Sequence, residues 1–173
     1  MPQASRLLLP SLSAKRQAEN KRAWNEQRSC DQADFFTIGY TGRKIEEILE
    51  ILKAHGVRTL IDIRRNAISM YRPELSKTNL SRLLTEHGMC YTHQPELGVP
   101  RDIRAKAVDS GSRQIIWDWY DTHIVGSVLN LHQFLNGFEH PVALMCTEID
   151  PHECHRHRLS LALEGMGLNG FDL

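Results

Sequence analysis

Apolar residues along the chain alternate between short continuous runs and longer stretches in which they recur every three or four positions. Short runs bounded by turn residues are typical of buried strands, and the longer spacing is typical of helices with one apolar face. The expected strands cover residues 35–39, 59–63, 89–93 and 141–146. The expected helices cover residues 41–56, 76–88, 113–136 and 154–165. From residue 35 onwards, the chain is therefore predicted to alternate strand with helix.

Residues with known capping preferences mark the ends of the expected helices. Thr41 is expected to cap the helix that ends at Gly56, and Ser76 is expected to cap the next helix. Asp150 and Pro151 are expected to start the last helix, because Asp is a favourable cap and Pro is tolerated in a first turn. The closing letters "GFDL" leave room for one more short strand.

The expected strands are short and apolar throughout, which favours a parallel sheet covered by helices on both faces. Residues 34–173 are thus expected to form a single-domain α/β fold with a mostly parallel sheet of four to five strands. In such sheets, ligands bind beyond the carboxyl ends of the strands. Four polar segments follow the expected strand ends, namely "GYTG", "DIRR", "HQPELG" and "CTEIDPHECHR". We expect them to meet in one site.

The composition is that of an ordinary globular protein, with 41% hydrophobic and 24% charged residues. No apolar run approaches the roughly 20 residues that a membrane span needs, so we expect a soluble protein with no membrane contact. The 4 cysteines stand in a chain without a secretory leader pattern. They are therefore expected to be reduced thiols, which favours a cytoplasmic location.

Residues 1–33 form a basic arm without a strand pattern, expected to be helical or disordered. Residues 1–30 carry Arg6, Lys15, Arg16, Lys21, Arg22 and Arg28 against Glu19 and Glu26, although the whole chain has a net charge of zero. Such an arm could contact nucleic acid or a protein partner. The simpler interpretation is a solvated segment.

Four spaced segments resemble a family that is named only by its number, 488, among the domains of unknown function. These segments are "TIGYTGRKIEEILEILKAHGVRTLIDIR", "YRPELSKTNL", "YTHQPELG" and "ALMCTEIDPHECHRH", and they cover residues 36–166. The resemblance implies a compact Rossmann-like α/β fold with one site at the four strand ends, and it supplies no reaction or substrate. The chain departs from the family at Tyr40, where a histidine is common, and at Leu75, where an aromatic residue is usual.

Cys146 is the leading candidate for chemistry. A thiol at a strand end, close to a helix start and to His155 and Arg156, has surroundings that favour the thiolate. Glu148 and Asp150 oppose that effect, and a strand-end cysteine is often only a small buried hydrophobe. The spacing from Cys146 to Arg156 is also longer than in the anion-binding loops of phosphatases and sulfurtransferases.

Metal binding is a second interpretation of the same segment. Cys146, Cys154 and a nearby histidine, completed by His93, offer the ligands of a zinc site that would stabilise the domain. The two cysteines stand farther apart in sequence than in the usual zinc hook. We therefore assign no metal ligands from the sequence, and the cofactor is unknown.

Anion binding is the third interpretation. Free N–H groups at the start of the last helix, together with Arg156, suit a phosphate or carboxylate. Arg64 and Arg72 leave the neighbouring strand and could complete the binding site. The alternative is that these arginines simply pair with Glu74 or Glu96.

Three further side chains follow the expected strand ends. Asp62 is either a structural hydrogen-bond acceptor or a general base, because a buried carboxylate needs partners. His93 is either bonded to the backbone or a proton shuttle. Tyr40 could hydrogen-bond a ligand or pack over the edge of the sheet.

Our leading hypothesis is an enzyme or enzyme-like protein that binds a phosphate-bearing or other anionic substrate, with a nucleotide or nucleic acid among the candidates. The alternative is a non-catalytic module that binds nucleic acid or protein through the basic arm. A zinc-stabilised domain is the second alternative. The catalytic candidates are Cys146, Asp62 and Glu148, and the substrate-binding candidates are Tyr40, Arg64, Arg72, His93, Cys154, His155 and Arg156.

Overall fold

The computed structural model describes residues 25, 26, 28–126 and 131–173. Its sheet contains five parallel strands in the order β3-β2-β4-β1-β5. The strands are β1 (Phe35–Gly39), β2 (Thr59–Asp62), β3 (Cys90–His93), β4 (Val142–Cys146) and β5 (Gly170–Asp172). The predicted α/β fold is confirmed, including the short strand at the end of the chain. β4 is the central strand, between β2 and β1.

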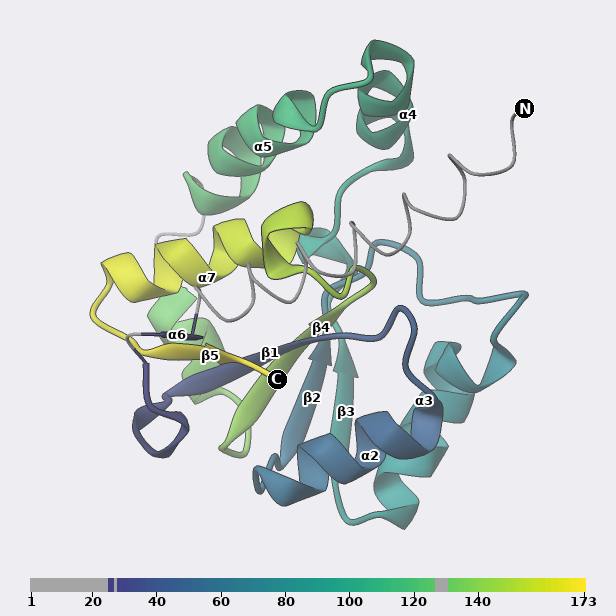
Figure 1. Cartoon of the computed structure of the whole chain (residues 1–173), viewed down its shortest axis with the longest axis vertical. Coiled ribbons are helices and arrows are strands. Elements are labelled where there is room, and N and C mark those ends of the chain that lie inside the picture. The colour runs from purple at the N-terminus through teal and green to yellow at the C-terminus, as the bar shows by residue number, and fades with distance from the viewer. Residues whose placement is uncertain (1–24, 27, 127–130) are drawn as a thin grey trace, which may run out of the picture.

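Helices cover both faces of the sheet (Figure 1). One face carries α2 (Ile45–Ala54) and α3 (Lys77–Glu86), whose buried leucines join a core with β1, β2 and β4. The opposite face carries α4 (Arg101–Ser110), α5 (Gln114–Tyr120), α6 (Leu131–Asn136) and α7 (His155–Gly165), whose buried side chains join a second core. The two cores share the strands and are separated by the sheet.

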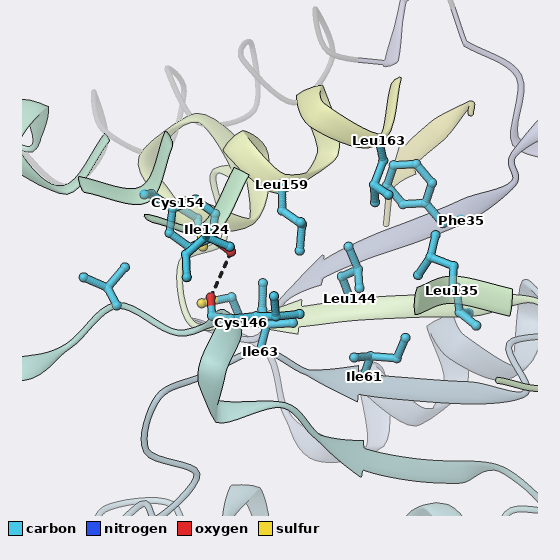
Figure 2. Close-up of a cluster of buried hydrophobic side chains, with 14 of the residues drawn as sticks. Phe35, Ile61, Ile63, Ile124, Leu135, Leu144, Cys146, Cys154, Leu159 and Leu163 are labelled. Atoms are coloured by element: carbon cyan, nitrogen blue, oxygen red, sulfur yellow. Dashed lines mark hydrogen bonds between the residues drawn. The ribbon is translucent and has the colours of Figure 1, made fainter. Parts of the chain in front are cut away.

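The alternation of side chains along β4 decides which residues can meet at its end. Val142, Leu144 and Cys146 point into the core under α7, whereas Ala143 and Met145 point toward α2 and α3. Figure 2 shows Cys146 in the first of these cores, at the same end of it as Cys154. The Cys146 thiol is therefore directed toward the beginning of α7.

Two helix starts differ from the prediction. α2 begins at Ile45 rather than after Thr41, because the Thr41 hydroxyl donates to the Thr147 carbonyl at 2.7 Å and the following Gly42 has a φ of 80°. Asp150 does not cap α7. Its carboxylate accepts the His152 N–H at 2.9 Å and caps a short 3-10 turn, and α7 starts after Cys154.

The single helix expected at residues 113–136 is wrong. α5 ends at Tyr120 and continues as a π-helical turn, Asp121–Val125, in which the Gly126 N–H donates to the Asp121 carbonyl at 2.8 Å. α6 then begins at Leu131. The apolar spacing continues through this change of geometry, so the spacing alone does not reveal it. The prediction also missed α4, whose few apolar residues make its periodicity weak.

Most of the predicted basic arm, residues 1–24, lies outside the described residues. Its described end is tied to the domain: the Asn25 side chain donates to the Asp172 carbonyl at 2.9 Å, and Arg28 forms a salt bridge with Glu164 at 2.7 Å. Within the described part of the chain, no helix has the length and apolar character needed to cross a membrane.

The close approach of β1 to the loop after β4 gives a test of the fold. A Cβ atom at Gly39 would overlap the backbone of Glu148 and Ile149, whereas a Cβ atom at Gly165 would meet no atom within 4 Å. We expect Gly39→Ala to lower the free energy of unfolding by about 1–3 kcal/mol or more, because the loop must move. Gly165→Ala, the matched control, should be neutral or slightly stabilising. Urea denaturation measures both, and equal stability of the two variants would contradict this packing.

Candidate functional site

A cavity of about 260 Å³ opens beyond the carboxyl ends of β1, β2 and β4. Its lining comes from the segments that follow these strands and from α4 and α7, and it includes Tyr40, Arg64, Arg65, Arg104, Cys146, Glu148 and His155. Three of the predicted strand-end segments, those after β1, β2 and β4, therefore meet in one place. The fourth predicted segment, "HQPELG", does not line the cavity, although the residue that follows it, Val99, does.

Cys146 lies at the buried floor of this cavity, with 2% of its surface exposed. Its Sγ atom is 3.8 Å from Glu148 Oε2 and 3.7 Å from His155 Nδ1. Burial opposes the charged form of His155, but Cys154 and Glu148 favour it, and the pKa of His155 lies above its ordinary value. The thiol thus touches one carboxylate and one imidazole, and either group can accept a proton from it.

Cys154 lies directly behind Cys146 and does not line the cavity. It is 1% exposed, and burial together with the neighbouring Cys146 raises the pKa of its thiol well above the ordinary value. One potential ligand atom from each of Cys146, Cys154 and His155 lies within 4.8 Å of the others. Two thiols and one imidazole are a ligand set suited to zinc and similar metals.

His93 stands apart from this group. Its Nε2 atom is 2.8 Å from the Arg64 carbonyl oxygen, so the ring holds the segment after β2 in place. Of the two predicted options for His93, the structure thus shows the hydrogen bond to the backbone. Of the zinc ligands suggested by the sequence, the two cysteines and a nearby histidine, His155, come together, but His93 does not join them.

Asp62 is fully buried on the face of the sheet opposite Cys146. Its carboxylate accepts two hydrogen bonds from the Arg64 guanidinium, at 2.8 and 2.6 Å, and one from the Tyr91 hydroxyl at 2.7 Å. Burial and the charge of Asp62 raise the pKa of Tyr91, so Tyr91 stays protonated and donates. Asp62 therefore holds Arg64 and Tyr91 in place and does not reach the cavity.

The Tyr40 ring lies beside two of the arginines that follow β2. The Arg64 and Arg72 guanidinium groups lie 5.2 and 6.0 Å from the centre of the Tyr40 ring. Arg72 pairs with Glu74 at 2.9 Å, as the simpler interpretation of the sequence expected, and does not line the cavity. The Tyr40 hydroxyl lies 3.2 Å from Thr147 Oγ1, which joins the ends of β1 and β4.

Arg156 is fully buried and serves the fold rather than the cavity. It forms a salt bridge with Asp172 at 3.2 Å and donates hydrogen bonds to the carbonyl groups of Glu148 and Ile149. The exposed arginines that line the cavity are Arg65 and Arg104. Sequence reasoning passed over Arg104 because it did not recognise α4, whose helix formers "RDIRAKAV" were the available signal.

The fold and this site define a parallel α/β protein with a thiol, an imidazole and a carboxylate at the floor of an arginine-lined cavity. Residues 44–163 match the family described as domain of unknown function DUF488, and the chain belongs to this family. No curated protein and no solved structure matches the chain.

Two neighbouring arginines test the structural role of Arg156. We expect Arg156→Met to lower the free energy of unfolding by about 3–5 kcal/mol, because it leaves the buried Asp172 charge without this cation. Arg158 pairs with Asp121 at the surface, so Arg158→Met should change stability by less than about 1 kcal/mol. Urea denaturation compares the two variants. A small effect of Arg156→Met on the free energy of unfolding would contradict this structural role of Arg156.

Proposed function

We propose that the chain is an enzyme or enzyme-like protein whose cavity binds a phosphate-bearing or other anionic substrate, with the reactive centre at Cys146. The observation that carries the proposal is the position of the Cys146 thiol. It touches both Glu148 and His155 at the floor of a cavity lined by Arg64, Arg65 and Arg104. Reactive groups and cationic groups thus share one small space.

Arg65 and Arg104 supply the charge that would hold an anion. Arg64 is already bound to Asp62, whereas neither Arg65 nor Arg104 forms a salt bridge with any carboxylate that the structure describes. A guanidinium group presents several N–H donors to a phosphate or carboxylate in fixed geometry. The cavity is smaller than most pockets for drug-sized ligands, so it suits the charged end of a substrate better than the whole of a large one.

Glu148 and His155 supply proton transfer. The Cys146 thiol donates to the Glu148 carboxylate at 3.8 Å, a contact that supports Glu148 as a proton acceptor. His155 Nδ1 lies 3.7 Å from the same thiol, and the His155 ring lies 5.2 Å from the Tyr120 ring between centroids. Asp62 is the third catalytic candidate from the sequence. In this proposal it positions the Arg64 guanidinium and takes no direct part in the chemistry.

The loop after β2 supports a substrate with an aromatic part, such as a nucleotide. Ile68 lines the cavity and is 69% exposed, and the same loop continues with Met70 and Tyr71, which are 89% and 98% exposed. Large apolar side chains this exposed, next to a cationic cavity, are suited to stacking on a base whose phosphates enter the cavity.

Anion binding is tested with pyrophosphate and adenosine diphosphate by calorimetry. Arg104→Gln and Arg65→Gln should each weaken binding of both probes roughly tenfold or more, because a hydrogen bond to a charged group contributes about 1.5–3 kcal/mol. Arg101→Gln is the matched control, since Arg101 is exposed on the same helix and does not line the cavity. Equal affinities for all three variants would contradict the proposal. Loss of binding only on deletion of residues 1–24 would favour the non-catalytic module instead.

The aromatic part of the substrate is tested separately. Tyr71→Ala should weaken binding of adenosine diphosphate, because stacking of one base on an aromatic side chain contributes about 1–3 kcal/mol. It should leave pyrophosphate affinity unchanged. Val108→Ala removes another exposed apolar side chain, on α4, and serves as the control. If Tyr71→Ala affects both probes or neither, the loop does not recognise a base.

A further inference from the structure

We infer that Cys146, Cys154 and His155 form a binding site for a divalent transition metal that favours thiolate and imidazole ligands, with zinc the foremost candidate. The inference deepens the proposed function, on which it rests, because it places a metal ion at the floor of the same cavity. It also assigns Cys154 a role, that of a metal ligand. That cysteine does not line the cavity.

The spacing of the three ligand atoms fits one tetrahedral ion. With Zn–S bonds of about 2.3 Å and Zn–N bonds of about 2.0–2.1 Å, a tetrahedral site separates two sulfur atoms by about 3.8 Å and sulfur from nitrogen by about 3.5 Å. The Cys146 sulfur lies 3.7 Å from His155 Nδ1, and all three ligand atoms lie within 4.8 Å of one another. Only a small movement of side chains is needed to bring the ligands to coordination distance.

The backbone explains how cysteines so far apart in sequence come together. Cys146 is the last residue of β4, and its side chain points to the α7 face of the sheet. The chain then makes the 3-10 turn Pro151–Glu153, held by the Asp150 cap, and returns so that Cys154 and His155 start α7. Because of this turn, Cys154 lies close to Cys146 although the two cysteines are farther apart in sequence than those of an ordinary zinc hook.

The surroundings of His155 favour a metal ligand. Its Nε2 atom lies 3.3 Å from the Ile63 carbonyl oxygen, an arrangement in which Nε2 carries the proton and donates it. Nδ1 then has a free lone pair and lies 3.7 Å from the Cys146 sulfur; Nε2 lies 3.8 Å from the same sulfur, so the ring would turn slightly to present Nδ1 to the ion. A histidine that binds a metal through one ring nitrogen commonly donates the other N–H to a carbonyl or carboxylate group, which fixes its orientation.

Burial and Cys146 raise the pKa of the free Cys154 thiol, but one neighbour, Arg156, would stabilise a thiolate there once a metal is bound. Arg156 interacts electrostatically with Cys154, and the buried Arg156 Nε atom has no hydrogen-bond acceptor among the described residues. A thiolate at Cys154 would supply an acceptor for this donor, and a neutral buried thiol is a much weaker one. Metal coordination is what keeps a buried thiol deprotonated. Two thiolates also balance the charge of one divalent ion.

The ion would have an open position toward the substrate. Cys146 and His155 line the cavity, so an ion bound by them borders it, and the three protein ligands leave a fourth position of a tetrahedral site. Catalytic zinc sites have this composition, and the open position takes water or a substrate oxygen. Cys146 then acts as a ligand rather than as a free nucleophile, while Arg65 and Arg104 still bind the anion.

Cobalt titration tests the site directly. The full-length chain is kept reduced, stripped with a chelator and titrated with Co²⁺, and we expect one ion per chain with a thiolate-to-cobalt charge-transfer band. Zn²⁺ should remove the band and raise the melting temperature. Cys154→Ser and His155→Gln should lose or strongly weaken the band. Cys90→Ser, the control for an exposed cysteine, and His93→Gln, the control for a nearby histidine, should retain it.

A wild-type chain that shows no charge-transfer band would overturn the inference, as would a band that persists in both Cys154→Ser and His155→Gln. Circular dichroism reveals whether a variant folds. If one does not, the wild-type titration still tests the inferred metal site. Pyrophosphate binding to the stripped chain separates the two proposals. Anion binding without any metal binding leaves the proposed function standing alone, and metal binding without an effect of Arg104→Gln overturns only the proposed anion site.

Discussion

The buried Arg156 guanidinium is the interaction on which the geometry of the site depends. It donates hydrogen bonds to carbonyl groups of the loop after β4 and forms a salt bridge with the carboxylate of Asp172 in β5. It also interacts electrostatically with Cys154, the residue before α7. Asp172 in turn accepts the Thr37 hydroxyl at 2.5 Å, which ties the same network to β1. A buried ion pair of this kind contributes little net stability, but loss of one partner is costly, so contacts that are costly to break hold these segments together.

This network and the pleat of the sheet divide the polar residues into two groups. Asp62, Arg64 and Tyr91 form hydrogen bonds with one another on the α3 side, and of these three residues Arg64 also lines the cavity. Cys146 and Cys154 lie on the α7 side. The two groups follow neighbouring strands, yet a one-residue difference in position along a strand sends a side chain to the opposite face. The sheet therefore separates the structural carboxylate of Asp62 from the Cys146 thiol.

The strands and most of the helices could be predicted from the sequence because short apolar runs and helical spacing are local signals. The convergence of strand ends was also predictable, since it follows from a parallel sheet. The role of Arg156 was not, because its position in the first turn of a helix is compatible with anion binding and only the tertiary fold places Asp172 beside it. Arg104 was missed for a different reason: α4 has few apolar residues, and its helical character depends on its packing against the rest of the domain.

A free nucleophile and a metal ligand make different demands on the residues behind Cys146. A nucleophilic thiol needs a proton acceptor and an anion site, and Glu148, His155, Arg65 and Arg104 provide these without any second cysteine. The second buried thiol and the guanidinium beside it have no part in such a mechanism. Coordination of one ion uses both features, together with the orientation of His155 by the Ile63 carbonyl. It also explains why a chain would keep two thiols in contact inside its core, where burial raises the pKa of Cys154 and leaves it unreactive on its own.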